Sequence, residues 1–331
     1  MIWPHGETHM NAFAKLIYAT LFSFACCLGG TNAEEFPTRP ITLVVGLAAG
    51  GSVDIQARMF AAVAATKIGQ PIIIENKGGG GGVPAAASVK RAPPDGYTLM
   101  VMLGATHSVP TLALPFDPLN DFEPIISLYS QPGFVVVPRS LNVSSVEELI
   151  ALGKRRPGGL TYGSPSAGSP GHIMGALFGE FTGVKMTHVP YRGGGQMMAD
   201  LVTGVLDVCF PTYTNFQPFL ADKTLIPLAI LQSSRWEQMP AVPTLSERGY
   251  KDVDFANIFG IAGPKGIPSD IVQRLNGAFL AASQDEALLK RMEELGAVMI
   301  TSSDPSDFID RLKADNKRLT PIVQKIGIGV K

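Results

Sequence analysis

The chain has 331 residues, of which 17% are charged and 46% hydrophobic, and its 27 basic and 28 acidic side chains give a formal net charge of −1. A near-neutral chain without a basic block lacks the electrostatic signature of a nucleic-acid-binding protein, and this apolar content excludes intrinsic disorder. The 36 glycines and 26 prolines fall in clusters typical of loops. The length allows a core that is divided between two units.

The first 33 residues have the pattern of a secretory signal peptide. Lys15 precedes an apolar run over residues 16–28, and a small-residue stretch ending at Ala33 follows it. The run is shorter than the roughly 20 residues that a membrane-spanning helix needs. We therefore expect cleavage near Ala33, export to the periplasm, and a mature chain that does not span the membrane.

The cysteines and the start of the chain bear on this signal. Met10 lies just before the basic residue and is an alternative start to Met1. Cys26 as a lipidated anchor is an alternative to cleavage near Ala33, whereas cleavage near Ala33 removes both Cys26 and Cys27. Only Cys209 then remains, so the mature chain cannot form an internal disulfide and depends on its core for stability.

The rest of the chain alternates short apolar runs with amphipathic stretches that begin in Gly/Ser-rich turns, which predicts an α/β fold. Strands are expected at residues 41–45, 71–75, 97–102, 134–137, 160–163, 187–189, 206–210 and 225–231. Helices are expected at residues 52–69, 145–155 and 172–182, before Gly204, and from starts near Pro268, Asp285 and Pro305.

The first Gly/Ser-rich loop, residues 48–54, joins a strand to a helix. Free backbone N–H groups and the positive end of the helix meet at such a loop, and they bind anions without any lysine. The alternative is an ordinary tight turn in which Ser52 is the N-cap and Asp54 pairs with Arg58 one turn later. The candidate site takes Ala49, Gly50, Gly51, Ser52 and Asp54 from this loop.

The second loop, residues 162–172, opens another helix after another strand. Its serines and glycines offer hydroxyl groups and close backbone approach to a small polar ligand. A purely structural turn needs only one or two special residues, so this composition favours a binding role. The candidate site takes Ser164, Ser166, Ala167, Gly168 and Ser169 from it.

The third segment, residues 189–195, contains Tyr191 and leads into a helix that carries Asp200. Asp200 is either an exposed, solvated carboxylate or one that faces the cleft and takes an ammonium or protonated group. Tyr191 and Asp200 complete the candidate site together with Thr106 and His107, which follow the strand expected at 97–102.

Templates for catalysis and cofactor binding fit poorly. Pro170 directly after Ser169 removes a backbone N–H that an oxyanion hole would use, and the glycine run 78–82 matches a dinucleotide motif only by its repetition. The histidines and Cys209 lack metal-ligand spacing. We expect no cofactor, no metal and no catalysis, with an exported serine hydrolase using Ser166 or Ser169 as the alternative.

At this point the residues resemble a family, the periplasmic solute-binding receptors of tripartite tricarboxylate transporters, also called the Bug family. Any one match is weak, but many in one order cover the chain from Phe36 to Lys331. They comprise residues 36–41, the loop 49–54 with Arg58, Glu75-Asn76-Lys77-Gly78, residues 94–99, 121–122, 162–172, 188–193, 199–201 and 240–245, Glu247, Gly249 and Gly296-Ala297.

The resemblance implies a two-lobed Venus-flytrap fold, type II-like, with a ligand cleft between the lobes. Lobe 1 would combine residues 34–135 with 232–331, and lobe 2 would comprise 136–231. In the family the loops matching 48–54 and 164–169 hold a ligand carboxylate, largely through backbone groups and ordered water, and the position matching Asp200 lies at the other end of the ligand. The implied partners are a small carboxylate and membrane transporter subunits, and the implied state is a monomer.

Departures from the family pattern bear on the ligand. The first loop lacks two prolines that the family usually has, and Leu47 stands where the family has an aromatic ring. Ser166 stands where glycine is common. These changes leave room for an aromatic acid as well as an aliphatic di- or tricarboxylate. A sensory subunit that presents the bound ligand to a membrane kinase would share the same site and differ only in its partner.

Overall fold

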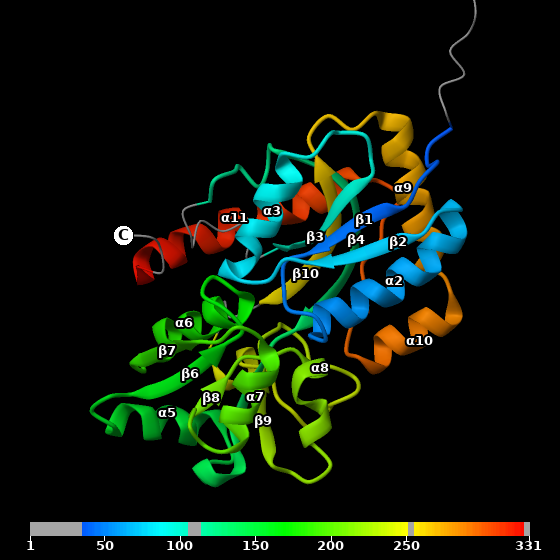
Figure 1. Ribbon diagram of the computed structural model, residues 1–331. Coiled ribbons are helices and arrows are strands. Elements are labelled where there is room, and N and C mark those ends of the chain that lie inside the picture. The colour runs from blue at the N-terminus through cyan, green and yellow to red at the C-terminus, as the bar shows by residue number, and fades with distance from the viewer. Residues whose placement is uncertain (1–34, 105–113, 251–254, 328–331) are drawn as a thin grey trace, which may run out of the picture. The chain divides into compact units, whose positions relative to one another are not determined.

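The computed structural model describes residues 35–104, 114–250 and 255–327 (Figure 1). Contacts divide the chain into two units, Met1–Thr38 and Arg39–Lys331, and the second unit holds every element described below. The expected signal peptide lies outside the described residues. Within these residues no helix combines the length and apolar character needed to cross a membrane.

A six-stranded mixed sheet has the strand order β11-β4-β10-β3-β1-β2. Strand β1 pairs in parallel with β2 and β3, whereas β10 lies antiparallel between β3 and β4. The strands are β1 (Ile41–Val45), β2 (Ile72–Asn76), β3 (Thr98–Leu103), β4 (Phe122–Pro132), β10 (Ala256–Pro264) and β11 (Val298–Met299). The accompanying helices are α2 (Ser52–Ile68), η1 (Gly80–Gly82), α3 (Val83–Lys90), α9 (Ser269–Ala282), α10 (Glu286–Glu294) and α11 (Ser306–Ile326).

A five-stranded mixed sheet has the strand order β7-β6-β8-β5-β9. Its strands are β5 (Phe134–Pro138), β6 (Leu160–Ser164), β7 (Met186–Pro190), β8 (Val208–Cys209) and β9 (Leu225–Ile230). Between them lie η2 (Arg139–Leu141), α5 (Val146–Arg155), α6 (Pro170–Thr182), α7 (Gly194–Val202), α8 (Tyr213–Phe216) and η3 (Gln217–Phe219), while η4 (Ser246–Arg248) follows β9.

The two sheets share one topology although the sequence shows no internal repeat. In each sheet the first parallel strand, β1 or β6, lies between the next two strands of that sheet along the chain. The strand next to these three, β10 or β5, is antiparallel and directly follows a strand of the other sheet in the chain. The chain passes between the sheets at Gly133 and again between the end of β9 and the start of β10. Parallel strands joined by helices place their loops at one sheet edge, where α/β proteins bind ligands.

The core of the five-stranded sheet lies on both of its faces. Alternate residues of β5 show this, because Val135 and Val137 pack in one apolar cluster while Phe134 and Val136 pack in another. Helix α11 joins the cores of the two sheets: Phe308 packs with residues of the six-stranded sheet, and Val323 packs with the five-stranded sheet.

Most expected elements are present, with three corrections. Helix α6 begins at Pro170, two residues before its expected start, because proline suits the first turn of a helix. Strand β8 is only two residues long. The sequence patterns did not predict β4, β10 or α3. Glycines in β10 hid it: a Cβ at Gly260 would lie 2.4 Å from the ring of Phe308, so close packing requires the residue that weakens the strand signal.

Candidate functional site

A pocket lies where glycine-rich loops from both sheets meet. Its empty volume is about 710 Å³, part of it open to solvent. The lining comes from the loop after β1, from Gly79, from the loops after β6 and β7, and from α8. The lining residues are Leu47, Ala48, Ala49, Gly50, Gly51, Ser52, Gly79, Pro165, Ser166, Arg192, Gly193, Gly194, Gly195 and Asn215.

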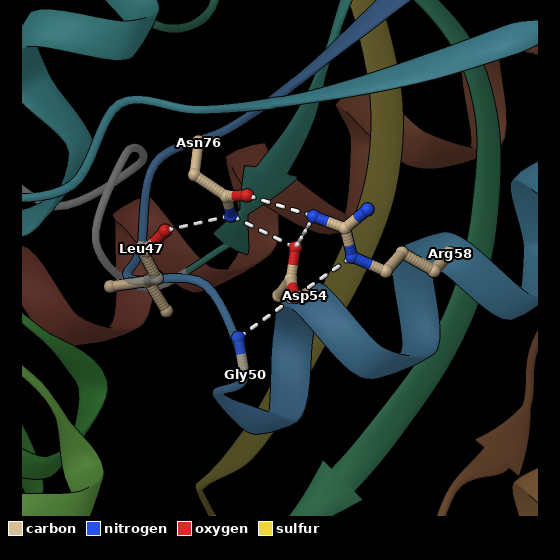
Figure 2. A network of polar contacts seen from close by, with 5 residues as sticks. All are labelled: Leu47, Gly50, Asp54, Arg58 and Asn76. Atoms are coloured by element: carbon tan, nitrogen blue, oxygen red, sulfur yellow. Dashed lines mark hydrogen bonds and ion pairs between the residues drawn. The ribbon is translucent and has the colours of Figure 1, made fainter.

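Asp54 holds the first loop in shape from beneath (Figure 2). Its Oδ2 accepts from the Gly50 N–H at 2.9 Å and from Arg58 Nε at 3.0 Å, while its Oδ1 accepts from Asn76 Nδ2 at 2.9 Å. The Asn76 Nδ2 also donates to the Leu47 carbonyl at 3.1 Å. One buried carboxylate therefore holds the lining segment at Gly50 and, through Asn76, at Leu47, without lining the pocket itself.

These contacts also set the ionisation of Asp54. Burial by itself would raise the pKa of this carboxyl, but the hydrogen bonds from Arg58, Gly50 and Asn76 outweigh burial and lower its pKa below the ordinary value of 3.8. The pairing of Asp54 with Arg58 that the helical spacing predicted is present. The N-cap of α2 is Gly51 and makes no side-chain cap, so the alternative in which Ser52 is the N-cap is wrong.

The hydroxyl groups of two serines hold the second loop, and a third serine of this loop lines the pocket. Ser164 Oγ and Ser169 Oγ donate to the Ser166 carbonyl at 2.8 and 2.7 Å. The hydroxyl of Ser166 is buried, has no hydrogen-bond partner among the described residues, and belongs to a residue that lines the pocket. Buried polar atoms are nearly always paired, so this hydroxyl is available to a ligand.

Two histidines support this loop from behind. His188 Nε2 lies 2.7 Å from Ser164 Oγ, and His172 Nδ1 accepts from the Gly168 N–H at 3.0 Å. The rings stack with centroids 3.9 Å apart. Burial lowers the pKa of His172 from 6.5 to about 4, and burial with the neighbouring His172 charge does the same for His188. Both rings are therefore neutral at pH 7.

The third loop brings a second helix start to the pocket. Helix α7 has Gly193 as its N-cap and, like α2, no side-chain cap. The first N–H groups of a helix have no partner within the helix, and its N-terminus carries partial positive charge. Arg192 adds a full positive charge and makes no ion pair with any described residue. Two helix ends and one free guanidinium therefore favour an anion.

The residues expected in the site divide into three groups. Ala49, Gly50, Gly51, Ser52 and Ser166 line the pocket. Asp54, Ser164, Ala167, Gly168, Ser169, Tyr191 and Asp200 are not in its lining, and several of them hold the loops. Thr106 and His107 lie outside the described residues.

The geometry gives Asp200 a local partner. Tyr191 Oη donates to Asp200 Oδ2 at 2.7 Å, so this carboxylate fixes the entry into α7. Of the lining residues that the candidate site omitted, Arg192 to Gly195 belong to the third glycine-rich segment, which signalled them. Gly79 belongs to the glycine run 78–82, which was considered only as a dinucleotide motif, and Asn215 carried no comparable signal, because its place in the pocket depends on how distant segments pack.

The described residues give little support to chemistry on a ligand. Ser169 Oγ is bonded to a carbonyl, and neither Ser169 nor Ser166 contacts a histidine nitrogen. The serine that does contact one, Ser164, is fully buried and does not line the pocket. The same residues contain no cluster of three or more histidine, cysteine or acidic side chains that would hold a metal.

Solved structures identify the class of the fold. An R. palustris protein with adipate matches with a TM-score of 0.82 and 33% identity, over 88% of this chain and 98% of that one. MatC from Rhodopseudomonas palustris with bound malate matches with a TM-score of 0.83 and 30% identity, over 87% and 100%. The fold is that of the two-lobed periplasmic binding proteins, which confirms the expected fold class.

The sequence comparisons identify the family. The profile of the tripartite tricarboxylate transporter family receptor matches residues 56–328. BugT from Bordetella pertussis is 30% identical over 304 residues, 91% of this chain and 93% of that protein. A UPF0065 protein in the gbd 5' region of Cupriavidus necator is 37% identical over 276 residues, 83% and 84% of the two chains. The chain belongs to this receptor family and is a solute-binding receptor.

Proposed function

We propose that the chain is exported to the periplasm by cleavage near Ala33 and binds a small organic carboxylate in the pocket lined by Leu47 to Ser52, Ser166 and Arg192 to Gly195. It then delivers the acid, chemically unchanged, to membrane transporter subunits. Residues 34–135 with 232–331 act as one lobe and 136–231 as the other, and the receptor works as a monomer.

The observation that carries this proposal is the meeting of two uncapped helix starts with the unpaired guanidinium of Arg192 and the unpartnered hydroxyl of Ser166. Backbone N–H groups and a guanidinium are the donors that suit a carboxylate. The relatives solved with adipate and malate support the same ligand class.

Calorimetric titration of the mature chain tests the proposal. The protein is first unfolded and refolded to remove any ligand carried through purification, and is then titrated with adipate, malate and benzoate. The corresponding amides are the controls, because they keep the shape and lose the charge. An acid that binds also stabilises the folded protein, by about 2.7 kcal/mol when its concentration is a hundred times Kd. The melting temperature then rises as well.

Arg192→Gln locates the site. The exchange should weaken acid binding about tenfold and reduce its dependence on salt, since a charge-assisted contact is lost. Arg155→Gln is the matched control, because Arg155 is an exposed arginine in the last turn of α5 that does not line the pocket. Equal affinities of both variants would remove Arg192 from the site, and failure of every acid to bind would overturn the proposed function.

A further inference from the structure

A second, apolar hollow adjoins the carboxylate pocket. The two share Leu47, Ser52, Pro165 and Asn215 in their linings, so they lie next to each other. The walls of the second hollow include Met174, Met197, Phe210 and Phe259, and none of the described residues that line it is charged. A ligand whose carboxylate lies in the first pocket can therefore extend an apolar body into the second.

The apolar hollow contains one polar group that the fold leaves without a partner. Asn257 lines it, is 2% exposed, and makes no hydrogen bond through either Nδ2 or Oδ1 to the described residues. A buried amide with both atoms unpaired destabilises a protein, since each lost hydrogen bond leaves a desolvation penalty. A ligand that supplies a donor and an acceptor would form the hydrogen bonds that this amide lacks.

The surroundings of Asn257 fix it in place. It lies on β10 opposite Gln131, whose Nε2 is engaged by the Leu295 carbonyl at 3.0 Å. Two residues further on, Phe259 stacks against Tyr129 with ring centroids 4.6 Å apart. The Oε1 of Gln131 also lacks a hydrogen-bond partner among the described residues, and neither Gln131 nor Phe259 pairs with the Asn257 side chain, so the amide of Asn257 stays available to a ligand.

The hydrogen-bonding capacity of the Asn257 amide determines which ligand group can pair with it. Asn257 offers an NH2 group that donates and a carbonyl oxygen that accepts, and a hydroxyl group can pair with either because it both donates and accepts. A carboxylate accepts from Nδ2 but meets Oδ1 with like charge, and it would be buried among uncharged residues. The far end of the ligand is therefore neutral and polar.

From these two hollows we infer that the receptor prefers a monocarboxylate with an apolar body and a hydroxyl group at its far end, which Asn257 recognises. This inference rests on the proposed function and adds a substrate class to it. It predicts discrimination against the aliphatic dicarboxylates that related receptors bind, adipate among them.

Three acids test the inference by titration calorimetry: 3-(4-hydroxyphenyl)propanoate, 3-phenylpropanoate and adipate. We expect the hydroxylated acid to bind about tenfold more tightly than the acid without the hydroxyl, the effect of roughly one well-made hydrogen bond. Adipate should bind more weakly than either. The methyl ether of the hydroxylated acid should lose the preference, since it can no longer donate to Oδ1.

Asn257→Leu separates recognition from structure. The variant should bind the two aromatic acids with equal affinity, and its melting temperature should be equal to or higher than that of the wild type, because an unpaired buried amide has been removed. A structural asparagine would instead make the variant less stable. If the variant does not fold, the affinities of the three acids for the wild type still test the inference.

The outcomes distinguish this inference from the proposed function. If the acids bind but the wild type shows no preference for the hydroxyl group, if adipate binds most tightly, or if Asn257→Leu keeps the preference, the inference is overturned and the proposed function stands. If none of the three acids binds and the wider acid panel also fails, both are overturned.

Discussion

Asp54→Asn replaces one atom beneath the pocket and should loosen the loop that lines it. Each carboxylate oxygen of Asp54 faces two donors: Oδ2 faces the Gly50 N–H and Arg58 Nε, and Oδ1 faces Asn76 Nδ2 and the other end of the Arg58 guanidinium. An asparagine at this position has one oxygen and one NH2. Whichever way its amide turns, the NH2 group faces two donors and two contacts are lost.

The expected loss of stability follows from which contacts remain. One lost contact involves a neutral donor, worth about 1 kcal/mol, and the other involves Arg58, where a charged partner raises the value to about 1.5–3 kcal/mol. The Arg58 side chain is 51% exposed, so solvent screening places its contribution at the low end. We expect a loss of about 2–3 kcal/mol, or ~3–5 °C in melting temperature for a unit of this size.

Urea unfolding at several pH values measures the effect. The pKa of Asp54 is lower in the folded chain than its ordinary value of 3.8. Its contribution is therefore fully present above that value and is lost as the pH falls through the folded pKa. The difference between wild type and variant should be constant from about pH 5 to 8 and should shrink below about pH 4.

Asp270→Asn is the matched control, because Asp270 is an exposed carboxylate in the first turn of α9 and keeps the same relation to its helix dipole. It should change stability by no more than about 0.5 kcal/mol. Equal losses for the two variants at pH 7, or a difference that persists undiminished at pH 3, would refute the role assigned to Asp54.

The histidine pair and the helix glycines give further predictions. His172 and His188 titrate near pH 4 when folded and near 6.5 when unfolded, so the unfolded chain binds more protons between these values and stability falls as the pH drops from 6.5 toward 4. Unfolding at pH 7 and 5 should show a loss that the double variant His172→Gln/His188→Gln reduces, and an equal loss in both proteins would contradict this. Gly175→Ala in α6 should destabilise the protein by about 1–3 kcal/mol, because its Cβ would lie 2.1 Å from the Tyr162 ring. Gly277→Ala in α9 should stabilise the protein by up to about 1 kcal/mol, because the added Cβ would have nothing within 4 Å and alanine favours a helix. If the melting temperatures of the two variants shifted in the same direction, the packing described at these glycines would be contradicted.

Local signals in the sequence predicted the elements that carry the pocket loops. A β-branched run followed by Gly50, Gly51 and Ser52 and then by helical spacing indicates a strand, a turn and a helix without knowledge of the rest of the fold. The pairing of Asp54 with Arg58 is likewise a contact between neighbours one helical turn apart. Such features depend on a few adjacent residues, so they can be read from the chain.

Features that depend on distant contacts could not be predicted in this way. Strand β10 pairs with β4 across more than a hundred residues of chain, and its glycines are explained only by side chains distant in sequence or beyond the strand, Phe308 at Gly260 and Ile267 with Leu99 at Gly263. The partner of Asp200 depends on which face of α7 turns toward Tyr191. The orphaned amide of Asn257 is visible only once every neighbour has been placed, because an asparagine in the sequence gives no sign of whether its hydrogen bonds will be made.

Two of the side chains with unpaired buried atoms, Ser166 and Asn257, link stability to recognition. Ser166 lines the carboxylate pocket and Asn257 lines the apolar hollow, and each leaves the free protein about 1–3 kcal/mol less stable than a fully paired core would be. A ligand that satisfies both groups recovers this free energy on binding, whereas an acid that reaches only the first pocket recovers part of it. Selectivity then arises from the length and far end of the ligand, because the helix ends and Arg192 attract any carboxylate equally.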